Sequence, residues 1–119
     1  MQYAHARIAG VLKRAADEGY SAADADVALL VHEAEQTLLR KLLLLPEVVE
    51  KIVIELAPHH LTHYAQELAG AFHAFYTQCR VIQADQPDLT KSRLRLLEAT
   101  RVVLARTLGL MGISAPDSM

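Results

Sequence analysis

The sequence holds two tyrosine–arginine pairs, and the members of each pair are four positions apart. Tyr3 precedes Arg7, and Tyr76 precedes Arg80. Residues four apart lie on one face of a helix, so each pair would sit together if both stretches are helical. A tyrosine ring can stack on an unpaired base for about 1–3 kcal/mol, and a guanidinium donates to base edges or phosphate. The two pairs therefore suit contacts with single-stranded nucleic acid.

A structural interpretation of the same residues stays open. Tyr3 would then fill a gap beside its helix, and Arg7 would pair with a local acid. Tyr76 would be a tyrosine at the edge of the core whose hydroxyl finds a partner. From residue types alone this is the commoner outcome, so the pairs by themselves do not decide the function.

The last helical stretch carries an arginine in an apolar stripe. Arg101 shares its face with four leucines, namely Leu94, Leu97, Leu104 and Leu108. An arginine in such a place needs a partner, and Glu98 lies three residues earlier on the same face. We expect a structural ion pair between Arg101 and Glu98.

Signs of catalysis are weak. His59 and His63 are four apart and could share a metal on a helix. The stretch HHLTH at 59–63 nevertheless lacks the glutamate of the zinc-protease pattern, with Leu61 following His60. We prefer solvated histidines at a helix start. The sequence has no glycine-rich phosphate loop and no nucleophile elbow, and Cys79 is its only cysteine. We expect no catalytic residue, metal or cofactor in this chain.

Composition predicts one domain spanning residues 1–119, because this length suits a single core. A net charge of -2 argues against non-specific binding to polyanions, although four arginines gather in one C-terminal segment: Arg93, Arg95, Arg101 and Arg106. The chain lacks a signal peptide pattern and any apolar run near the roughly 20 residues that cross a bilayer. With a single cysteine, a soluble cytoplasmic protein is expected.

The abundance of alanine and leucine predicts an all-α bundle of about five helices. The first should cover residues 2–18. Ser21 or Asp24 should cap a short second helix, with the helical pattern continuing over residues 33–45. Pro46 and Pro58 should each open a further helix, the second reaching about residue 81 as the central core helix. The last should run over residues 89–110, after a polar loop at 83–88, and a tail follows.

Five stretches occur in one order along nearly the whole chain: QYAHARI at 2–8, LLRKLLLLPEVVE at 38–50, AFHAFYTQCRVI at 71–82, SRLRLLEATRVVLARTLGLMGISAP at 92–116, and a terminal methionine. Together they resemble the C-terminal, DALR-type anticodon-binding domain of arginyl-tRNA synthetases, which are class I aminoacyl-tRNA synthetases. The resemblance implies a helical bundle that binds the anticodon loop of arginine tRNA.

The resemblance also assigns residues. Its tyrosine and arginine in the first helix, its tyrosine in the long helix and its final methionine line a pocket for the central cytosine of the anticodon. The matching positions are Tyr3, Arg7, Tyr76 and Met119. Arg80, the second member of the later pair, is expected to donate to base or phosphate.

The larger enzyme that the resemblance implies is an ATP-dependent ligase that joins arginine to its tRNA, with ATP and magnesium in a catalytic domain. The family's ATP-binding signatures are missing from this sequence, so we interpret the chain as an excised part of that enzyme. The expected partners are arginine tRNA and the catalytic domain, without a membrane and as a monomer. Alternatives are the related domain of cysteinyl-tRNA synthetase or of the glycyl enzyme's β subunit, or a helical module that docks on a protein through its last helix.

Overall fold

The computed structural model describes residues 2–55 and 59–112, and within these ranges every regular element is helical. The elements in chain order are α1 (Gln2–Asp17), the 3-10 turn η1 (Val27–Leu29), α2 (Glu33–Leu43), α3 (Leu45–Glu55), α4 (His59–Gln78) and α5 (Pro87–Leu110). The predicted all-α bundle of about five helices is confirmed. No described helix is long and apolar enough to cross a membrane.

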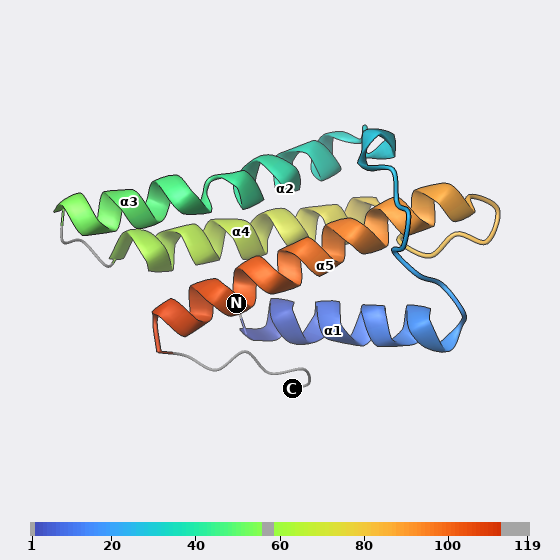
Figure 1. Ribbon diagram of the computed structural model, residues 1–119, viewed down its shortest axis with the longest axis horizontal. Helices are drawn as coiled ribbons and strands as arrows, with labels where there is room; N and C mark the ends of the chain where they lie inside the picture. The colour runs from blue at the N-terminus through green and yellow to red at the C-terminus, as the bar shows by residue number, and fades with distance from the viewer. Residues whose placement is uncertain (1, 56–58, 113–119) are drawn as a thin grey trace.

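Helix α4 forms the centre of the bundle. Figure 1 shows α2 and α3 along one side of α4, and α5 crossing next to it with α1 on the far side. The side chains of α4 that face the core recur at spacings of three and four: Leu61, Tyr64, Leu68, Phe72 and Phe75. Burial of such a stripe is what stabilises a helix of this kind, and the predicted central core helix is confirmed.

Helix α1 packs mainly on α5 and only lightly on α4. Its buried face includes Ala4, Ile8, Val11 and Ala15, all of which join a single core cluster with α4 and α5. The light packing between α1 and α4 leaves a surface seam, and Tyr3, Arg7 and Tyr76 lie along it.

The prediction for the second helix was wrong. Neither Ser21 nor Asp24 caps a helix, because residues 20–26 form no helix and Asp24 adopts a left-handed φ of 60°. A residue in that conformation ends any helix through it. The cap instead falls on Asp26, whose Oδ1 accepts from the Ala28 amide at 3.0 Å and starts η1.

Other boundaries moved by a few residues. Helix α3 begins at Leu45, one residue before Pro46, and α5 begins at Pro87 rather than Leu89, with proline in its first turn. Helix α4 ends at Gln78, short of the expected residue 81. Pro58 lies outside the described residues.

The expected ion pair between Arg101 and Glu98 is not formed. The Glu98 carboxylate lies 3.5 Å from Arg95 instead, and Arg101 is only partly buried. A half-exposed guanidinium keeps contact with water and needs no buried partner. The buried arginine of this helix is Arg93, which is 7% exposed, so the C-terminal arginines do not form one surface patch.

Candidate nucleic-acid interface

Two of the predicted positions on α1 and one on α4 meet at the surface. Nη2 of Arg7 donates to the Tyr3 hydroxyl at 2.8 Å. The same guanidinium lies over two rings, with its central carbon 5.2 Å from the Tyr3 ring centre and 4.7 Å from that of Tyr76. Arg7 therefore joins Tyr3, which the spacing of four predicted beside it, to Tyr76, a residue distant in sequence that the resemblance assigns to the same pocket.

Local packing explains the position of these side chains. Tyr3 and Arg7 project from the face of α1 next to its buried stripe, so Tyr3 is 53% exposed and Arg7 is half-buried. On α4, the Tyr76 ring rests 5.8 Å from the buried Phe72 ring, which fixes it at the edge of the core. Each cation–π contact of Arg7 contributes about 0.5–1 kcal/mol at an exposed site.

His73 belongs to the same cluster, and the sequence interpretation missed it. Its imidazole lies 6.2 Å from the Tyr3 ring and 5.2 Å from the Phe72 ring, measured between centres. Partial burial, and then the nearby charge of Arg7, lower the pKa of His73, so the imidazole is neutral at physiological pH. A neutral imidazole offers one donor and one acceptor. Its position three residues before Tyr76, one turn earlier on the same helix, could have indicated from the sequence that it lies in this cluster. We refer to Tyr3, Arg7, His73 and Tyr76 as the α1–α4 seam.

Arg80 lies two residues beyond the end of α4, and its side chain is exposed. Its backbone is held firmly, because the Arg80 carbonyl accepts from Nη1 of Arg93 at 2.6 Å and from the Gln83 amide at 3.0 Å. Nε of Arg93 also donates to Oε2 of the buried Glu35 at 2.7 Å. Arg93 thereby ties α2 and α5 to the chain at Arg80.

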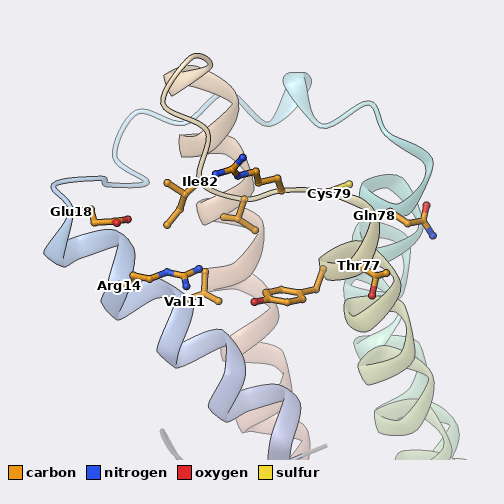
Figure 2. A pocket seen from close by; sticks show the side chains of 10 residues that line it. Val11, Arg14, Glu18, Thr77, Gln78, Cys79 and Ile82 are labelled. Carbon is orange, nitrogen blue, oxygen red and sulfur yellow. The ribbon is translucent and has the colours of Figure 1, made fainter.

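An open hollow of about 590 Å3 lies beyond the seam, between α1 and the end of α4. Its lining comes from these two helices and from the residues that directly follow each of them: Val11, Arg14, Glu18, and the continuous stretch from Tyr76 to Ile82. Figure 2 shows the side chains of Arg14, on α1, and Glu18, just after α1, reaching toward the hollow, whereas Gln78 points away from α1. Tyr76 belongs both to the seam and to the wall of this hollow.

Met119, the remaining predicted site residue, lies outside the described residues. His59 and His63 each contact a neighbouring side chain of the protein. Nε2 of His63 lies 3.0 Å from Glu67, and the His59 ring lies 4.4 Å from that of His60. No group of three metal-ligating side chains occurs in the described part of the chain.

The chain belongs to the DALR anticodon binding domain family, whose pattern matches residues 1–119. The family resemblance drawn from the sequence is therefore confirmed. Among the curated relatives that match are several arginine–tRNA ligases. The chain is 55% identical over 119 residues to the ligase of Dehalococcoides mccartyi strain BAV1, and 47% identical over 122 residues to that of Carboxydothermus hydrogenoformans.

The match covers all of this chain in both cases but only 21% and 22% of the two ligases, so the chain spans about a fifth of their length. The fold agrees with the arginyl-tRNA synthetase of Thermus thermophilus at a TM-score of 0.77 and 32% identity. That likeness covers 99% of this chain and 20% of the Thermus chain.

Proposed function

We propose that this chain is the anticodon-binding domain of an arginine–tRNA ligase and that it binds the anticodon loop of arginine tRNA. Family membership and the ligase relatives support the general assignment. The observation that carries the site is the position of Arg7 between the rings of Tyr3 and Tyr76. This places donors and stacking faces together on one surface.

The chemistry suits a splayed pyrimidine. The exposed Tyr3 ring offers a face for stacking, and Arg7 offers donors to the N3 and O2 acceptors of cytosine. Uracil carries an N–H at its N3, so the same guanidinium would meet a donor and lose a hydrogen bond. Arg80 would contact base or phosphate, and Met119 would close an apolar wall of the pocket.

The rest of the ligase supplies the reaction. Joining arginine to tRNA requires ATP and magnesium, and this proposal places both in the catalytic domain, outside this chain. The chain's partners would then be arginine tRNA and the catalytic domain of the same polypeptide, in the cytoplasm and as a monomer. Its own task is to hold the anticodon.

A binding comparison tests this function. Fluorescence polarisation would measure the affinity of the chain for arginine tRNA and for the same tRNA with its middle anticodon base changed. We expect tighter binding to the unchanged tRNA by about tenfold or more, since a wrong base leaves donors unpaired. Equal affinity for both tRNAs would contradict the proposal, and competition with cysteine and glycine tRNAs would separate the related domains.

The Arg7→Ala variant tests the site itself. We expect its affinity for arginine tRNA to fall about tenfold, because it loses a charge-assisted hydrogen bond to the base. Arg40→Ala is the matched control: Arg40 is exposed on α2, on the other side of the bundle from α1, as Figure 1 shows. Wild-type affinity in Arg7→Ala would refute the assignment. A binding constant that hardly responds to salt would favour the protein-docking alternative through α5.

A further inference from the structure

We infer that the hollow beside Tyr76 is a second nucleotide subsite, which takes the loop nucleotide adjacent to the base held at the α1–α4 seam. In this subsite Arg14 and Arg80 contact the phosphate, and Glu18 accepts hydrogen bonds from the base. The inference rests on the proposed function, and it assigns Arg14 and Glu18 a role beyond that of the seam.

The size and position of the hollow support this. Its volume of about 590 Å3 falls within the range of about 300–1,000 Å3 that is usual for small-molecule sites. Tyr76 forms part of its wall, and the same ring lies under the Arg7 guanidinium, 4.7 Å away. The seam and the hollow therefore share one aromatic ring, and adjoining nucleotides of one strand can reach both.

The charge of the hollow differs from that of the whole chain. The protein has a net charge of -2, whereas the hollow is lined by two arginines and one glutamate. Across residues 2–55 and 59–112, the side chains of Arg14 and Arg80 form no hydrogen bond or ion pair. Their donors are free for a phosphate, the group that single-stranded nucleic acid presents at every step.

Glu18 gives the subsite a preference among bases. It is four residues after Arg14, yet no ion pair between the two is formed in the described structure, and its side chain reaches toward the hollow (Figure 2). A carboxylate only accepts hydrogen bonds, so it repels phosphate and favours a base edge that carries donors. The pairing edge of guanine presents two neighbouring N–H groups, which suit a carboxylate best. Adenine and cytosine present one amino group, and uracil presents a single imino group.

Helix α1 offers a matched control for each residue. Lys13 and Asp17 are exposed and carry the same charges as Arg14 and Glu18, but they do not line the hollow. General electrostatic attraction, or the effect of a charge near the end of α1, would act on Lys13 as on Arg14. A phosphate contact would act on Arg14 alone.

The first experiment measures the affinity for arginine tRNA by fluorescence polarisation across a series of salt concentrations. We expect Arg14→Ala to bind about tenfold more weakly at low salt. The slope of log K against log salt should become shallower by about 0.7, the value for one phosphate contact of a single strand. Lys13→Ala should keep both the affinity within about twofold and the wild-type slope. Thermal melts of all variants check that folding is unchanged.

The second experiment measures base preference with tRNAs in which either neighbour of the middle anticodon base is changed. We expect the wild-type chain to prefer guanine at one of these positions, and Glu18→Gln to lower that preference about fivefold or more, while Asp17→Asn leaves it intact. Preference for the middle base should stay the same in both variants.

The outcomes separate this inference from the proposed function. If Arg14→Ala matches Lys13→Ala in affinity and slope while Arg7→Ala still binds weakly, the subsite is overturned and the proposed function stands. If Glu18→Gln keeps the wild-type base preference, the role of Glu18 is overturned. If the wild-type chain does not distinguish arginine tRNA by its middle anticodon base, the proposed function fails and the subsite fails with it.

Discussion

Arg7 and Arg93 carry the same charged group into opposite surroundings. Arg93 is almost fully buried, and it donates to the Glu35 carboxylate and to the Arg80 carbonyl. Arg7 lies half-buried on two tyrosine rings, and its Nη2 donates to the exposed hydroxyl of Tyr3. The donors of Arg93 therefore stabilise the fold, whereas Arg7 keeps donors that a ligand can use.

The elements around the two arginines differ in the same way. Helix α4 packs closely on α2 and also contacts α5, and Tyr64 adds a further link between α4 and α2 by donating to the Lys41 carbonyl at 2.6 Å. Helix α1 touches α4 only lightly. A substitution in the packed region should therefore change the free energy of unfolding, and one in the seam should change binding.

The largest effect is expected at Arg93. Replacement by methionine leaves the Glu35 carboxylate buried without its cation, and this should lower the free energy of unfolding by about 3–5 kcal/mol, measured by urea denaturation. The double variant Glu35→Met with Arg93→Met removes both charges and should recover most of the loss. A change below about 1 kcal/mol in Arg93→Met would show that this pair is not a determinant of stability.

The next effect concerns Tyr64 at high pH. Burial raises the pKa of Tyr64 from 10.0 to about 12. The folded protein thus holds this proton more tightly than the unfolded chain does. Its contribution is complete below pH 10 and is lost as the pH rises from about 10 to 12, amounting to at most about 3 kcal/mol.

Tyr64→Phe isolates that contribution. The variant loses one buried hydrogen bond, which should cost about 1 kcal/mol at neutral pH. Denaturation curves recorded between pH 9 and 12 should then show the stabilities of wild type and variant converging and then crossing as the pH rises. Parallel curves over that range would contradict a raised pKa at Tyr64.

The sequence predicted the helices well where apolar spacing was regular. The stripe on α4 placed the central core helix, and the buried face of α1 was read in the same way. The segment before α2 was predicted wrongly, because a serine or aspartate before apolar residues looks the same whether or not a helix follows. Only the backbone at Asp24, with its left-handed φ, decided against the helix.

The site could be predicted in part. Spacing of four placed Tyr3 beside Arg7, but the approach of Tyr76 depends on how α1 packs against α4, which no local pattern encodes. The pair of Arg93 with Glu35 joins residues 58 apart and was missed for the same reason. The sequence instead predicted a pair between Arg101 and Glu98, because these two residues are only three positions apart.

The smallest effect on stability is expected at Tyr3, where two variants separate its hydroxyl from its ring. Tyr3→Phe loses the acceptor for Arg7 but keeps the stacking face, so its affinity for arginine tRNA should fall by about threefold or less. Tyr3→Ala loses the face as well, and its affinity should fall about tenfold, because stacking on an aromatic ring contributes about 1–3 kcal/mol.

Tyr3→Phe should change the free energy of unfolding by less than about 0.5 kcal/mol, since the Tyr3 side chain is 53% exposed. Tyr3→Ala also loses the cation–π contact with Arg7, so its change should be no more than about 1 kcal/mol. Tyr3 would be a structural residue after all if Tyr3→Ala lost stability and kept its affinity for tRNA. If both variants bound tRNA equally weakly, the contribution of Tyr3 to binding would come from its hydroxyl, which orients Arg7, and not from its ring. Loss of binding in Tyr3→Ala alone, at unchanged stability, would support a base stacked on Tyr3.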